Sequence, residues 1–111
     1  MSNERDMDTA DELEAAADFL RAHGWIQHET SHGNRCCVLG ALSVAINGNA
    51  REGASNTTAA KSLRKTLGLG ASYRDGSHPI AWWNDRPNRT ADEVIDALME
   101  AAARLRTGEL K

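Results

Sequence analysis

The sequence is poor in the residues that cross-link, stiffen or anchor a protein chain. It contains two cysteines, two prolines, three tryptophans, one tyrosine and one phenylalanine in 111 residues. The cysteines are the neighbours Cys36 and Cys37, which could bond to each other only through a small strained ring, so we expect free thiols. No apolar run approaches the roughly twenty residues that a membrane-spanning helix needs, and the N-terminus lacks the basic-then-apolar order of a secretory signal. We therefore expect a cytoplasmic protein with no membrane partner.

A continuous surface of positive charge is also lacking. The 13 lysines and arginines are outnumbered by 16 acidic residues, which gives a net charge of −3. Apart from Arg64–Lys65 and Arg104–Arg106, the basic residues are scattered along the chain. A phosphate backbone finds no basic stripe to bind, so we expect no duplex nucleic acid partner. Seven of the acids fall within the first eighteen residues, where they would favour the positive end of a helix.

Apolar residues recur at helical spacing along most of the chain, which predicts a single domain with an all-α fold. Thr9 followed by Glu12, and Thr90 followed by Glu93, are capping-box patterns that mark the starts of two helices. The segment 37–46 is apolar on nearly every side and is expected to lie in the core. The pattern predicts a compact bundle of four main helices and one short helical turn, over residues 9–23, 37–46, 58–67, 79–83 and 90–107.

The same pattern sets the expected limits of the domain. Residues 1–8 are predicted to form a flexible acidic N-terminus, residues 9–107 the helical domain and residues 108–111 a short tail. Only the stretch HGWIQHE at 23–29 has a preference for extended backbone. A lone strand has no partner in this pattern, so we predict no sheet.

The stretch HETSHGNRCC at 28–37 brings two imidazoles and two thiols together in the sequence. His28, His32 and Cys36 have the ligand chemistry that zinc prefers, and His23 or Cys37 would complete a tetrahedron. Their spacing matches none of the usual paired-ligand patterns, because the chain has no Cys-x2-Cys and no second pair farther along. We predict no metal and no cofactor. His28, His32 and Cys36 are the candidate ligands of a weaker alternative, a metal-binding protein.

Cys37 is a candidate nucleophile because it stands where a predicted helix begins, and a helix N-terminus favours a thiolate. His78 and then Asn84 or Asp85 follow it in the order cysteine, histidine, amide or acid, as in papain-like enzymes. The chain is far shorter than those hydrolases, and the residues around Cys37 lack their signature. The catalytic candidates of this alternative, a thiol-dependent hydrolase or transferase, are Cys37, His78 and Asp85.

A structural role explains the same residues without chemistry. Cysteine is often buried where a helix begins, and we expect position 37 to face the core while position 36 faces the preceding loop. Gly40 would let another helix approach closely. Packing therefore competes with catalysis as the reason for this segment.

The aromatic residues gather at one corner of the sequence. Trp82 and Trp83 are adjacent, so on a helical turn they point about a hundred degrees apart and both are hard to bury. One of them is expected to be exposed, beside amide and acid groups and a Gly/Ser loop. Such a corner suits recognition, although a tryptophan laid over the domain edge is the plain alternative. The candidate binding residues are Trp82, Trp83, Asn84, Asp85 and Tyr73.

Four motifs in order carry a resemblance to a known family. HGW at 23–25, CVLGAL at 37–42, IAWWND at 80–85 and RTADEVIDAL at 89–98 resemble a family of small actinobacterial and actinophage proteins, a domain of unknown function. The resemblance covers residues 10 to 105 and maps the family pattern onto Cys37, Gly40–Ala41 and Trp83–Asp85. It does not include His28, His32 or Cys36. It implies an actinobacterial or phage origin and no particular activity.

These observations predict a non-enzymatic binding or interaction module. We expect it to act on a host protein or a small ligand, and the resemblance suggests an accessory protein of a phage or prophage. The thiol-dependent enzyme on Cys37 is the first alternative, and the metal-binding protein is the second. An alanine-rich face of the first or last helix would also suit a homodimer.

Overall fold

The computed structural model describes residues 4–70 and 78–110, and over this part of the chain the protein is mostly helical, as the sequence predicts. The core is one cluster that draws on every main helix. The elements, in chain order, are α1 (Glu4–His23), β1 (Ser31–His32), β2 (Arg35–Cys36), α2 (Val38–Asn47), α3 (Thr58–Leu67), α4 (Pro79–Asn84) and α5 (Ala91–Arg106).

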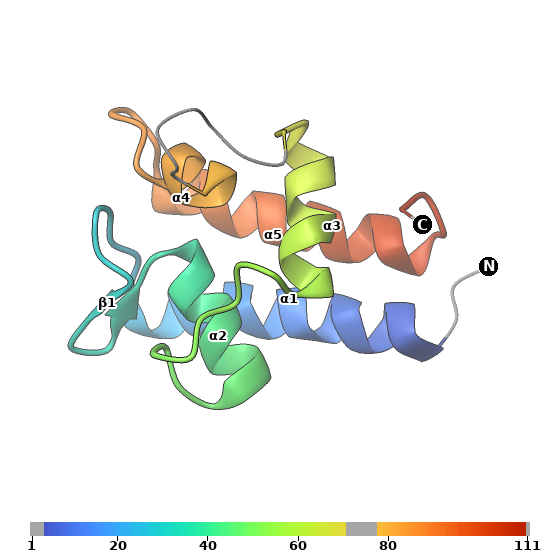
Figure 1. The fold of residues 1–111 in the computed structure, drawn as a ribbon, viewed down its shortest axis with the longest axis horizontal. Helices are drawn as coiled ribbons and strands as arrows, with labels where there is room; N and C mark the ends of the chain where they lie inside the picture. Colours follow the sequence, from blue (N-terminus) through green and yellow to red (C-terminus); the bar gives the residue numbers. More distant parts are fainter. Residues whose placement is uncertain (1–3, 71–77, 111) are drawn as a thin grey trace.

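The two longest helices, α1 and α5, lie against each other in opposite directions along the molecule (Figure 1). Their facing sides carry leucine and alanine, and the small alanines let the two backbones approach closely. At one end Arg106 donates from Nη2 to Asp11 Oδ1 at 2.9 Å and to Glu14 Oε1 at 2.6 Å. The wholly buried residues of this pair include Leu13, Ala16, Ala17, Leu98, Ala101 and Ala102.

Helix α1 begins at Glu4 and not at the predicted Thr9. Thr9 and Ala10 are buried inside the helix, so the Thr9–Glu12 pattern does not mark its start. The acids that precede Thr9 favour the positive end of the longer helix. Residues 4–8, predicted to be a flexible terminus, are therefore helical, and residues 1–3 lie outside the described part of the chain.

Helix α2 occupies the core, as its apolar sequence predicts. Val38, Ala41 and Leu42 are wholly buried, and the helix contacts α1, α3 and α4. Cys37 is its N-cap and not its first residue. Gly48 ends the helix with a positive φ of 83°, a conformation that glycine adopts without strain.

The other helix ends follow the predicted capping chemistry with small shifts. Thr57 caps α3, one residue before the predicted Thr58. Pro79 opens α4 as predicted, and the Thr90–Glu93 capping box at the start of α5 is confirmed in both of its hydrogen bonds.

Residues 24–36 form a small hairpin that the sequence did not predict. Strand β1 pairs antiparallel with β2, Ser31 opposite Cys36 and His32 opposite Arg35. Trp25 adds a parallel bridge to Cys36, with Ile26 N–H donating to the Cys36 carbonyl at 3.0 Å. The expectation of no sheet was wrong because the partner strand comes from the same short stretch, after a turn at Gly33. Among the described helices, none is long and apolar enough to cross a membrane.

Candidate functional site

One buried side chain, that of Asn84 at the end of α4, joins three distant segments. Its Oδ1 accepts from the Trp25 indole N–H at 2.6 Å and from the Val38 backbone N–H at 3.0 Å. Its Nδ2 donates to the Ile26 carbonyl at 3.2 Å and to Asp85 Oδ1 at 2.9 Å. Asn84 is wholly buried, and the amide satisfies donors and acceptors that would otherwise be costly to bury. We call these five residues the Asn84 cluster.

A second amide fastens the same loop to α4. Gln27 Nε2 donates to the Asn84 carbonyl at 3.1 Å and to the Arg86 carbonyl at 2.7 Å. Carbonyls at the end of a helix have no partner within the helix, so Gln27 acts as a side-chain cap. The segment 24–28 is therefore held against the end of α4 from two sides.

The far end of this segment presses on the first turn of α2. The Cys37 N–H donates to the Thr30 carbonyl at 3.0 Å, and a Cβ on Gly40 would overlap the Thr30 carbonyl oxygen. Gly40 is thus required for a close approach, as expected, but the segment that approaches is the Thr30 backbone and not another helix.

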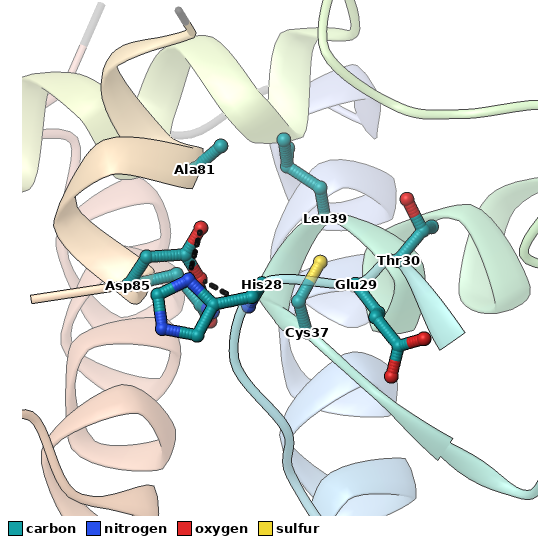
Figure 2. A pocket seen from close by; sticks show the side chains of 8 residues that line it. His28, Glu29, Thr30, Cys37, Leu39, Ala81 and Asp85 are labelled. Atoms are coloured by element: carbon teal, nitrogen blue, oxygen red, sulfur yellow. Dashed lines mark hydrogen bonds and ion pairs between the residues drawn. The ribbon is translucent and has the colours of Figure 1, made fainter. Parts of the chain in front are cut away.

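A pocket of about 150 Å³ lies where these contacts meet. Figure 2 shows it between residues 28–30, the start of α2 and one face of α4. The lining is part apolar and part polar: His28, Glu29, Thr30, Cys37, Leu39, Ala81, Asn84 and Asp85. The Glu29 carboxylate is turned away from Asp85 in Figure 2 and lies 3.7 Å from the His32 ring.

Cys37 places its thiol at this pocket and at the start of α2. As the N-cap it accepts a hydrogen bond at Sγ from the Gly40 N–H at 3.4 Å. Its exposed fraction is 7%. Burial raises the pKa of the Cys37 thiol, backbone hydrogen bonds from Gly40 and Leu39 oppose that rise, and the Asp85 carboxylate adds to it. Since the pKa is raised, the thiol is held in its protonated form at neutral pH.

His28 stands beside the same carboxylate. Its backbone N–H donates to Asp85 Oδ1 at 2.8 Å, and its ring nitrogen Nδ1 lies 3.8 Å from Asp85 Oδ2 (Figure 2). The residue has a φ of 69°, a left-handed conformation that is uncommon outside glycine but that histidine adopts more often than most residues. The Asp85 carboxylate, which accepts from the His28 N–H, contacts the backbone directly at this residue.

His78, the predicted partner of Cys37, has a different position. It caps α4, where Nδ1 accepts from the Ile80 N–H at 3.1 Å and Nε2 lies 3.1 Å from the Ser55 carbonyl. Both ring nitrogens are therefore engaged, Nδ1 in capping α4 and Nε2 in holding it to the loop before α3. His28 is the imidazole that lines the Cys37 pocket. The sequence predicts only a metal-ligand role for His28 and gives no sign that this residue lies near Cys37.

The metal-ligand candidates are not brought together. Cys36 is part of the core and 2% exposed, so the expectation that position 36 faces the loop was wrong. Cys37 is buried as well, at 7% exposed. His32 is exposed on β1, and the His23 ring packs against Phe19 with centroids 4.5 Å apart. Within residues 4–70 and 78–110, no three His, Cys, Asp or Glu side chains stand where they could hold one metal ion.

The tryptophan corner is split between surface and interior. Trp82 is 40% exposed, with the Arg86 guanidinium 4.5 Å from the centroid of its ring. Trp83 is partly buried, with the Arg89 guanidinium 4.0 Å from its ring centroid. The predicted exposure of one tryptophan is thus confirmed. Asn84 is buried, Asp85 lines the pocket, and Tyr73 lies outside the described residues.

The fold and the site together define a small helical domain in which a thiol, an imidazole and a carboxylate line one pocket beside an exposed tryptophan. Residues 4–104 match the model of DUF6197, a family of unknown function, and the chain belongs to that family. No curated protein and no solved structure matches the chain.

Proposed function

We propose that this protein is a binding module that recognises a partner protein through the exposed side of α4. The observation that carries the proposal is the exposure of Trp82, a large apolar side chain of α4 that is 40% exposed. Tryptophan is among the residues enriched at the positions that contribute most of the binding energy in protein interfaces.

The neighbours of Trp82 support this role. Trp82 follows Ala81 in α4, and Ala81 lines the pocket together with Asp85, the C-cap of the helix. Arg86 stacks on the indole ring, which holds the ring in place and gives it a charged rim. We expect a partner surface with an apolar contact for the indole, surrounded by hydrogen-bond acceptors for the Arg86 guanidinium.

The sequence resemblance supports a more specific setting for the partner. We propose an accessory protein of an actinobacterium or of its phage, which acts on a host protein in the cytoplasm. Both cysteines are free thiols, which is in keeping with a reducing compartment.

The test replaces the proposed anchor and compares it with a matched surface residue. Met7 on α1 is the other large apolar side chain exposed to this degree in the described part of the chain, at 42%. We expect Trp82→Ala to weaken binding to a captured host protein by about 2 kcal/mol or more, while Met7→Ala leaves it unchanged. Binding is measured by calorimetry, with each variant checked for an unchanged unfolding midpoint. Equal binding by both variants would remove Trp82 as the anchor.

A further inference from the structure

We propose that the pocket is also a reaction site, in which the Cys37 thiol accepts an acyl group, His28 acts as general base and Asp85 positions His28. This inference goes beyond binding, and its reacting residues do not include Trp82, the proposed anchor for the partner. Its basis is that a nucleophile at the start of α2, an imidazole from the preceding hairpin segment and a carboxylate at the end of α4 line one cavity (Figure 2).

The position of Cys37 suits a nucleophile. Its Sγ already accepts a hydrogen bond from the first turn of α2, and this contact, with the helix dipole, stabilises negative charge as it develops on sulfur. The thiol is not sealed in the core, because it lines the pocket. Cys36, next to it, is packed in the core, so the two thiols have distinct roles.

His28 lies at the mouth of the pocket, with its side chain 73% exposed and its ring beside Asp85, and the ring must turn toward Cys37 Sγ to act as the base. Asp85 engages it twice, through the backbone N–H and near ring nitrogen Nδ1. Asp85 is itself fixed by the Asn84 amide, which also ties the loop before His28 to α4. A base in turn oriented by a carboxylate is the arrangement that activates hydroxyl and thiol nucleophiles. Because the Cys37 thiol is protonated at neutral pH, such a base is needed for attack.

The step balances as follows. The Cys37 Sγ–C bond forms at the carbonyl carbon of an ester, thioester or amide, and His28 takes the thiol proton. The bond to the leaving group then breaks, and the proton passes from His28 to that group. Water, activated by the same imidazole, cleaves the resulting thioester to a carboxylic acid and restores the thiol. The small volume and the apolar Leu39 and Ala81 in the lining favour a short, uncharged acyl group.

The test uses p-nitrophenyl acetate on the intact protein, with acetylation of each cysteine followed by mass spectrometry of quenched samples. We expect one acetyl group on Cys37, unchanged by Cys36→Ala. His28→Gly should slow this acetylation on the order of a hundredfold, the usual contribution of a general base. Glycine suits the positive φ at this position, and His28→Asn, whose side chain also tolerates it, is the second variant. His32→Ala removes the other exposed histidine of the hairpin and should have no effect.

Added imidazole separates chemistry from structure. It should restore acetylation of Cys37 in His28→Gly, because the small base fills the space left by the side chain, whereas a structural loss would persist. Asp85→Asn should slow the acetylation of Cys37 in the protein that retains His28. In the His28→Gly protein with added imidazole, the same substitution should leave the acetylation rate unchanged, since a positioning residue acts only through His28. The proposal is overturned if acetyl appears elsewhere or not at all, if both His28 variants react at the original rate, or if imidazole has no effect on a folded variant. Trp82→Ala should retain acetylation of Cys37. Failure of the partner-binding proposal can therefore be distinguished from failure of the acylation proposal.

Discussion

At the scale of single residues, Asn84 determines how the site is assembled. Because Asn84 follows two tryptophans, the sequence predicts that it is a binding residue. It could not show that the side chain points inward, because three of the partners come from residues 25, 26 and 38, and separation along a chain carries no information on distance. Helical spacing predicted correctly that one neighbouring tryptophan is exposed, since that depends only on the geometry of adjacent residues.

Removing the Asn84 amide should destabilise the whole protein. In Asn84→Ala the Trp25 indole N–H and the Val38 N–H lose their acceptor inside the core, and each unmet buried group costs about 1–3 kcal/mol. We expect the free energy of unfolding in urea to fall by about 2–4 kcal/mol. Asn88→Ala, at an exposed position four residues along, is the matched control. Equal stability of the two variants would show that the Asn84 cluster is not a source of stability.

At the scale of elements, local chemistry explains what the sequence predicted and what it missed. Capping residues and apolar spacing are local, so they located α2, α3, α4 and α5 to within a residue or two. The start of α1 was placed too late because Thr9–Glu12 has the form of a cap, yet the acids before it extend the helix. The hairpin at 24–36 was missed because its pairing depends on contacts with α2 and α4 more than on strand propensity.

The contact between this hairpin segment and α2 depends on Gly40. A methyl group there would overlap the Thr30 carbonyl oxygen and lie 3.1 Å from the Cys36 Cβ, so Gly40→Ala must push the segment away from the helix. We expect a loss of about 1–3 kcal/mol, in spite of the better helix propensity of alanine. Gly70→Ala meets no atom within 4 Å and should be neutral. Thermal unfolding of both variants provides the measurement, and a Gly40→Ala protein as stable as the original would contradict the close approach.

At the scale of the whole molecule, the pocket lies far from the start of α1 and the end of α5. The start of α1 and the end of α5 lie at one end of the α1–α5 pair, while β1 and α4 lie at the other (Figure 1). The radius of gyration of 12.8 Å is close to the roughly 13 Å of a compact chain of about this length. The loop that carries His28 lies outside the helical core, and the side-chain amides of Gln27 and Asn84 hold it there.

That arrangement predicts that the fold and the site need no metal. Apolar packing of α1, α2 and α5 and the capping of α5 supply the stability that zinc would supply in a metal-dependent domain, while Asn84 and Gln27 hold the histidine-bearing loop. We expect the midpoint of thermal unfolding to be unchanged by a strong chelator, and alkylation of Cys37 in the folded protein to be equally unaffected. Elemental analysis of the untreated protein is the control. One equivalent of zinc, together with a large fall in the midpoint after chelation, would mean that a metal and not the amide contacts holds the hairpin in place.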